Sequence, residues 1–267
     1  MQSAQLFTRR RTSSISTVPQ LQRPCLNIVD AAMHEAVPAI ASCGISPIVR
    51  IPDNQGYMVK SKIITFSKKG ILDRRLIKTG ALDCGAHGVL VPLLYTVEDA
   101  KNIVRSARFP PQGQRGFGSP FPQERFNPAL GATDYLKQAN ESILTIVQIE
   151  TKEALENVDE IAAVPGIDVL FVGPFDLGNN IGFPILDGTM HETLVTAIEK
   201  VLQAANSAGK KAGIFCSNGQ QGKVFADKGF HMISTATDIY VLAGGVMAAL
   251  ATAKGSGPAP KQQGYGS

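Results

Sequence analysis

Short apolar runs alternate with segments of helical spacing along most of this chain. The apolar runs predict six β-strands, at residues 47–52, 88–94, 142–150, 167–173, 211–215 and 231–236. Continuous apolar runs of this kind are typical of strands buried on both faces of a parallel sheet. We therefore expect an α/β protein in which helices cover a parallel sheet.

The segments between these runs predict the helices. In residues 191–208, for example, apolar residues recur every three or four positions. Asp30, Thr96 and Thr151 precede or begin predicted helices, where their side chains can cap the first backbone N–H groups. This many βα units favours a TIM (β/α)8 barrel, with a doubly wound sheet as the alternative. A closed barrel needs eight strands, so the six predicted here indicate an incomplete one.

Length and charge narrow the class of protein. The chain has 267 residues, 44% of them hydrophobic, and a formal net charge of +4. That length is enough for one large domain with a sizeable core. Residues 1–29 carry +4 and residues 61–80 carry +5, which leaves −5 for the rest. An acidic body argues against a nucleic-acid partner, and no apolar run reaches the roughly 18–20 residues of a membrane span.

The same composition predicts the domain organisation. We expect one barrel domain at residues 30–253, with residues 61–80 as a basic insertion and residues 254–267 as a flexible tail. Residues 1–29 are rich in Arg, Ser and Thr and contain no acid, which fits either a mitochondrial transit peptide or a disordered start. The four cysteines form no Cys-x-x-Cys pair and are interpreted as reduced thiols. We expect a cytoplasmic protein, with the mitochondrion as the alternative.

Polar residues at the carboxyl ends of the predicted strands are the first candidates for chemistry, because a barrel places its site there. Arg50 follows the run PIV, Gln148 and Glu150 end the next-but-one strand on one face, and Asp176 follows the strand after that. The carboxylates of Glu150 and Asp176 should converge, an arrangement that suits Mg²⁺ or Mn²⁺. Two solvated turn carboxylates are the alternative.

Other polar residues have open interpretations. Arg50 within an apolar strand requires an anionic partner, either a structural carboxylate or a substrate oxyanion. Asp83 could end a helix or support the site. The Gly/Pro-rich loop 110–120 could bind an anion through Arg115 or only connect two elements. None of the four histidines has the pattern of a catalytic base, and P-loop, G-x-G-x-x-G and nucleophile-elbow motifs are missing.

Three segments, in this order, resemble the HpcH/HpaI aldolase and citrate lyase family. They are ALDCGAHGVLVPLLYTVEDAKNIV, ARFPPQGQRGFG and VQIETKEALENVDEIAAVPGIDVLFVGPFDLG, and the similarity extends over about residues 30–250. The resemblance implies a metal-dependent class II aldolase on a (β/α)8 barrel of the phosphoenolpyruvate/pyruvate type. Such enzymes cleave 4-hydroxy-2-oxo acids to pyruvate and an aldehyde through a metal-stabilised enolate. It also implies Mg²⁺ or Mn²⁺ as cofactor, with Co²⁺ as an alternative, a small 2-oxo acid substrate and a homo-oligomer.

The resemblance further implies roles for individual residues. Glu150 and Asp176 would hold the metal, and Asp176 would also line the substrate site. Gln148 and the backbone N–H of Phe175 would bind the carboxylate of pyruvate. Arg50 would stabilise the enolate oxygen, where negative charge develops during cleavage.

The sequence departs from the family in two places. The catalytic histidine, whose basicity Asp83 would raise, is expected in an acid–x–Glu–His–Gly segment just before the helix that begins at Asp30. RPCLNIVDAAMHEA stands there instead, with His34 inside the helix, so we expect the first two βα units to be absent. Residues 61–80 interrupt a segment that is continuous in the family, and are either retained non-coding sequence or a surface loop.

These departures leave three functional hypotheses. The first is an active aldolase. The second is a catalytically impaired member that binds a metal and a 2-oxo acid, or oligomerises, without turnover. The third is a citrate-lyase-like enzyme that cleaves a carbon–carbon bond in a thioester.

Overall fold

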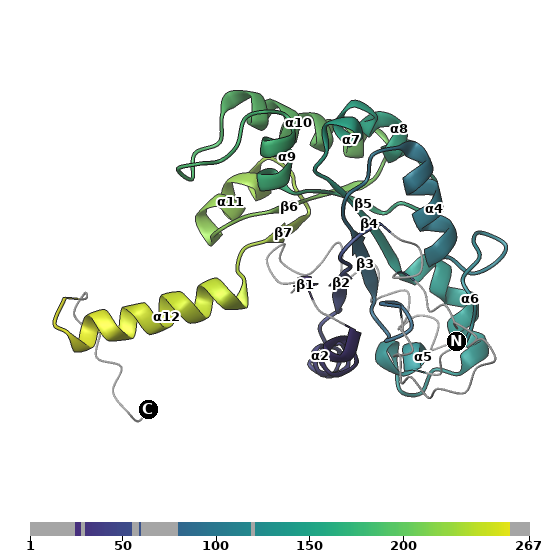
Figure 1. Ribbon diagram of the computed structural model, residues 1–267. Helices are drawn as coiled ribbons and strands as arrows, with labels where there is room; N and C mark the ends of the chain where they lie inside the picture. The colour runs from purple at the N-terminus through teal and green to yellow at the C-terminus, as the bar shows by residue number, and fades with distance from the viewer. Residues whose placement is uncertain (1–24, 28–29, 55–58, 60–79, 119–120, 257–267) are drawn as a thin grey trace, which may run out of the picture.

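The computed structural model describes residues 25–27, 30–54, 59, 80–118 and 121–256. Its strands form one parallel sheet in simple chain order (Figure 1). They are β1 (Cys25–Asn27), β2 (Ile48–Arg50), β3 (Gly88–Val91), β4 (Leu144–Ile149), β5 (Val169–Val172), β6 (Lys211–Phe215) and β7 (Met232–Ser234). A doubly wound sheet reverses its strand order part-way, so this order excludes that alternative. The predicted incomplete TIM-type barrel is confirmed.

The prediction of six strands was one short. β1 pairs in parallel with β2, with Cys25 opposite Ile48 and Asn27 opposite Arg50. A strand therefore does precede the helix that begins at Asp30, and the expectation that it is absent was wrong. Three residues, CLN, are too few to give an apolar run, so only the backbone pairing reveals this strand. Within the described residues β7 is not paired with β1, and the sheet stays open.

Helices follow the strands, and most of them pack around the curled sheet (Figure 1). They are α2 (Asp30–Ser42), α4 (Val97–Ala107), α5 (Phe121–Phe126), α6 (Ala132–Ser142), α7 (Lys152–Glu156), α8 (Val158–Ala163), α9 (Pro174–Asn180), α10 (Glu192–Ser207), α11 (Gly219–Asp227) and α12 (Asp238–Ala253). The predicted caps are confirmed at Thr96 and Thr151, whose side chains accept hydrogen bonds from the backbone N–H groups of Asp99 and Ala154.

The strands divide the core into two layers, as their burial on both faces requires. One layer lies on the face that carries Ile48, Leu90, Ile146 and Phe171, and the other joins the opposite face to the helices. Because successive strand residues point to opposite faces, the row Ile48, Ile146 and Phe171 continues at the carboxyl ends of the strands. The next residues in that row are polar in β2 and β4, where they are Arg50 and Gln148.

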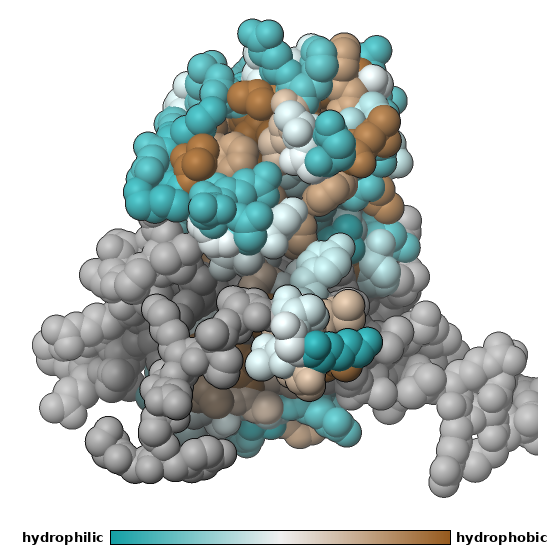
Figure 2. Space-filling view, turned by 90° about the vertical axis from the view of Figure 1, so that its left-hand side faces the viewer, coloured by the Kyte–Doolittle hydropathy of each residue, from teal (hydrophilic) through white to brown (hydrophobic). Residues whose placement is uncertain are grey.

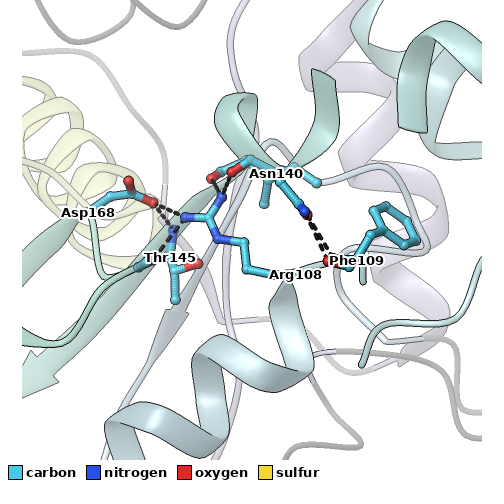
Figure 3. A network of polar contacts seen from close by, with 7 residues as sticks. Arg108, Phe109, Asn140, Thr145 and Asp168 are labelled. Atoms are coloured by element: carbon cyan, nitrogen blue, oxygen red, sulfur yellow. Dashed lines mark hydrogen bonds and ion pairs between the residues drawn. The ribbon is translucent and has the colours of Figure 1, made fainter. Parts of the chain in front are cut away.

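The buried Arg108 lies at the other end of the sheet, where strands β4 and β5 begin (Figure 3). The guanidinium of Arg108 donates to Asp168 at 2.7 Å and to three backbone carbonyl oxygens, including that of Asn140. Asp168 also accepts from the Thr145 N–H at 2.8 Å, and the Asn140 amide pairs with the backbone of Phe109 in both directions. The network ties the ends of α4 and α6 to the first residues of β4 and β5.

The last helix, α12, points away from the sheet (Figure 1). Its large apolar side chains are 43–70% exposed: Tyr240, Val241, Leu242, Val246, Met247 and Leu250. By contrast, the upper part of the molecular face in Figure 2 is mainly hydrophilic, with hydrophobic residues between the polar ones. A helix that is apolar on all sides is normally buried, so α12 lacks cover within the described part of one chain.

Several predictions concern residues outside the described ranges. Most of residues 1–29, 61–80 and 254–267 lie there, so the division into leader, insertion and tail stays a prediction. Among the helices that the structure does describe, none is both long and apolar enough to cross a membrane.

Candidate active site

The predicted polar residues of β2 and β4 form a connected chain of hydrogen bonds. Arg50 ends β2, Gln148 lies in β4, and Glu150 directly follows it. The Nε atom of Arg50 donates to Gln148 Oε1 at 3.0 Å, and Gln148 Nε2 donates to Glu150 Oε2 at 2.5 Å. The two bonds fix the amide orientation: its oxygen faces the cation and its nitrogen faces the carboxylate.

Asp176 joins this group from the first turn of α9, after β5. Its carboxyl group is within hydrogen-bonding reach of Glu150, which is fully buried. Burial raises the pKa of Glu150, and the charge of Asp176 raises it further, whereas the Leu93 N–H and the charge of Arg50 lower this pKa. Asp176 therefore lies near enough to Glu150 to raise the pKa of its carboxyl group, and the role of the two carboxylates as metal ligands stays a prediction.

The donor set fits a hard divalent cation. Two adjacent carboxylates repel each other, and a cation between them would remove that repulsion. Within the described residues no three His, Cys, Asp or Glu side chains converge, so Glu150 and Asp176 offer a pair rather than a closed cage. Mg²⁺ is commonly held by one or two carboxylates while it keeps several waters.

Two backbone features of the site were not predicted from the sequence. Leu93, just after β3, has a φ of 57° and donates its N–H to Glu150 Oε1 at 2.9 Å. Gly173, just after β5, approaches so closely that an added Cβ would lie 2.5 Å from Gln148 Nε2 and 2.8 Å from Glu150 Oε2. The glycine in VGPFDLG could have suggested close approach, but nothing in VPLLY signals the left-handed conformation of Leu93.

Asp83 belongs to a second cluster. Its carboxylate pairs with Arg115 at 3.0 Å, and both side chains are almost fully buried. Arg115 also donates to the Leu82 carbonyl at 3.0 Å and lies over the Phe109 ring. The described part of this loop, residues 110–118, thus brings Arg115 into the protein interior. The role of Asp83 beside a catalytic histidine stays a prediction.

Phe175 is the second residue of α9. Its N–H precedes the first hydrogen bond of that helix, which the Leu177 N–H donates to the Gly173 carbonyl. The ring is 45% exposed and makes an edge contact with Phe215 at the end of β6. The carboxyl ends of β2, β4, β5 and β6 therefore surround one region. His34, by contrast, lies 3.6 Å from Cys84 Sγ.

Comparison with known proteins decides the family. A sequence model of the HpcH/HpaI aldolase/citrate lyase family matches residues 27–244. The chain belongs to this family. That confirms the resemblance drawn from the three sequence segments.

Relatives within the family are named as aldolases. The chain is 36% identical to the hydroxypyruvate/pyruvate aldolase of Rhizorhabdus wittichii, over 65% of this chain and 67% of that protein. It is 38% identical to the 4-hydroxy-2-oxo-heptane-1,7-dioate aldolase of Klebsiella pneumoniae, over 62% of each chain. The matched part of this chain thus spans about two thirds of the length of these curated relatives.

Solved structures of the family share the fold. A family member from Burkholderia cenocepacia is 27% identical and superposes with a TM-score of 0.71, covering 91% of this chain and 89% of that one. An HpcH/HpaI aldolase from Desulfitobacterium hafniense gives a TM-score of 0.72 at 24% identity, covering 98% and 91%.

Proposed function

We propose that the protein is a metal-dependent aldolase that cleaves 4-hydroxy-2-oxo acids to pyruvate and an aldehyde. The observation that carries this proposal is the convergence of Arg50, Gln148, Glu150 and Asp176 at the carboxyl edge of the sheet. The names of the family relatives support the same reaction class.

In this proposal Glu150 and Asp176 hold Mg²⁺ or Mn²⁺, with Co²⁺ as an alternative. When bound, the cation supplies positive charge beside the oxygen on which the enolate charge develops. Gln148 and the Phe175 N–H orient the substrate carboxylate. The guanidinium of Arg50, held by Gln148 Oε1, adds a second positive charge at the enolate oxygen.

Cleavage breaks the bond between C3 and C4 of the 2-oxo acid. The electron pair of that bond passes into the enolate, which a proton then converts to pyruvate, and the 4-hydroxyl loses its proton to a base as the aldehyde forms. General base catalysis contributes about 10²- to 10⁴-fold to such reactions. The segment RPCLNIVDAAMHEA replaces the family's histidine segment. This replacement favours the impaired, ligand-binding member as the second candidate.

A coupled pyruvate-release assay tests the proposal. The substrate is a 4-hydroxy-2-oxo acid, with Mg²⁺, Mn²⁺, Co²⁺ or a chelator added, and an acyl thioester is tested in parallel. We expect metal-dependent pyruvate release that Glu150→Gln abolishes. No release above background, with Mn²⁺ still bound, would favour the impaired member. Cleavage of the thioester alone would favour the citrate-lyase-like alternative.

We further propose that the protein is a homo-oligomer in which α12 packs on a second copy. The exposed apolar side chains of this helix support the proposal, because they need cover and the described strands of every copy form the same open sheet. Exchange of an identical element between chains is a low-cost route to a dimer.

Light scattering after size-exclusion chromatography measures the oligomer. One chain has a mass of 28.4 kDa, and we expect a multiple of this mass. Leu242→Glu with Val246→Glu should lower the mass to one chain or cause aggregation. Leu186→Glu is the control, because Leu186 is 87% exposed in the loop between α9 and α10. A monomeric starting protein would contradict the proposal.

We place the protein in the cytoplasm. Cys43, Cys84 and Cys216 are free thiols, which fits a reducing compartment. A fluorescent protein fused to the C-terminus tests this location, and a mitochondrial signal would instead support a transit function for residues 1–29.

A further inference from the structure

Leu93 has an unusual backbone conformation beside the candidate metal ligands. Its φ of 57° makes it the single non-glycine residue with positive φ in the described part of the chain. The left-handed region is costly for a residue with a Cβ, and such strain persists only where surrounding contacts hold it. The conformation therefore requires an explanation in the contacts of Leu93.

Both sides of Leu93 are held by hydrogen bonds. Its N–H donates to Glu150 Oε1 at 2.9 Å, and its carbonyl accepts from Asn54 Nδ2 at 2.9 Å. The next carbonyl, that of Leu94, accepts from the Thr151 hydroxyl. The loop after β3 is thus held between Asn54, which follows β2, and the residues that follow β4.

These bonds also determine how Glu150 is presented. Oε1 accepts the Leu93 N–H and Oε2 accepts the Gln148 amide, so each carboxylate oxygen has a donor that fixes its direction. A carboxylate oxygen has two lone pairs, so each oxygen keeps one for a cation. The rotation of the Glu150 carboxylate is therefore restricted before any ligand arrives.

We propose that Asn54 is a positioning residue for the metal site: by holding the Leu93 carbonyl it keeps the strained Leu93 N–H directed at Glu150. The inference rests on the proposed function, since Glu150 is taken there as a metal ligand. In this role Asn54 acts through the backbone of Leu93 and is not itself a metal ligand. Partners of metal ligands are commonly needed for full metal affinity.

Titration of the full chain with Mn²⁺ alone, followed by calorimetry, tests the proposal without a substrate. Asn54→Ala should weaken Mn²⁺ binding about tenfold, the low end of the range for such partners. It should also speed hydrogen exchange at the Leu93 amide, because that N–H would no longer be held on Glu150. Unchanged affinity for Mn²⁺, or unchanged exchange at the Leu93 amide, would overturn the proposal.

A rescue experiment separates positioning from general loop damage. Glycine adopts positive φ without steric cost, so Leu93→Gly needs no bond from Asn54 to hold its N–H in place. Leu93→Gly alone, which keeps the backbone donor, is the reference for this comparison. Adding Leu93→Gly to Asn54→Ala should restore most of the lost affinity. Failure of this rescue would overturn the role of strain at Leu93.

Two further variants make the outcomes distinguishable. Asn157 also contacts this loop, because its amide lies 3.5 Å from the Tyr95 carbonyl, but it does not bond to Leu93, the residue that holds Glu150. Asn157→Ala is therefore the matched control. It should bind Mn²⁺ normally. If Glu150→Gln loses Mn²⁺ while Asn54→Ala does not, the positioning role is wrong and the metal site stands. If Glu150→Gln binds Mn²⁺ normally, the proposed metal site itself is wrong.

Discussion

The guanidinium of Arg50 donates to Gln148 Oε1 at 3.0 Å, across the intervening strand β3. An amide that receives a cation on its oxygen must present its nitrogen elsewhere, and here that nitrogen reaches Glu150. The arginine thus has two effects at once: it orients Gln148, and it brings a permanent positive charge to the carboxylate pair.

Removal of this arginine should slow turnover much more than it lowers stability. We expect Arg50→Ala to reduce kcat for pyruvate release by about 10²-fold or more, comparable to the loss of one donor to a developing oxyanion. Arg50→Lys keeps the charge but loses the planar geometry of the guanidinium. Its kcat should therefore lie between that of the starting protein and that of Arg50→Ala. An unchanged kcat in Arg50→Ala would show that Arg50 is not part of the site.

Gly173 should tolerate no side chain. A Cβ there would lie 2.5 Å from Gln148 Nε2, so Gly173→Ala must displace the amide that links Arg50 to Glu150. We expect loss of Mn²⁺ binding and of activity. Gly116→Ala is the control, because it is exposed and its added Cβ would meet nothing within 4 Å. If Gly173→Ala and Gly116→Ala behave alike, the packing around Gln148 is looser than the structure shows.

The network at the other end of the sheet should matter for stability alone. Asp168→Asn would remove the carboxylate that pairs with the buried Arg108 at 2.7 Å, at an expected cost of about 3–5 kcal/mol in the free energy of unfolding. Denaturant unfolding measures this loss, and kcat per folded molecule should not change. The exposed pair Arg105–Glu98 is the comparison, and Arg105→Ala should cost under about 1 kcal/mol. Equal losses for the two variants would contradict the structural role of Arg108.

Thiol labelling should separate the described cysteines. Burial raises the pKa of the Cys216 thiol to about 12, so at pH 8 almost none of it is the reactive thiolate. Cys43 is exposed, whereas Cys84 is buried. An alkylating reagent at pH 8 should therefore modify Cys43 first, as read by mass spectrometry of peptides, and Cys216 only after unfolding. Rapid native labelling of Cys216 would contradict its burial.

Several features of the fold followed from residue patterns alone. The apolar runs that contain Val89, Val147 and Leu170 predicted buried parallel strands, because only a strand covered on both faces has no polar alternation. Thr96 and Thr151 were found as caps, since capping depends on neighbouring backbone groups. β1 was missed because its residues, CLN, form no apolar run, so only the backbone pairing with β2 reveals it.

The chain order of strands and the period of two within each strand were enough to bring Glu150, Asp176 and Arg50 to one edge as candidates. The family segments identified the reaction class. Only tertiary structure decided that the Leu93 N–H holds Glu150, that Arg50 orients the Gln148 amide, and that Arg115 turns inward to Asp83. Hydrogen bonds between residues that lie 32–98 positions apart depend on how strands and loops meet in space, and no local pattern encodes that.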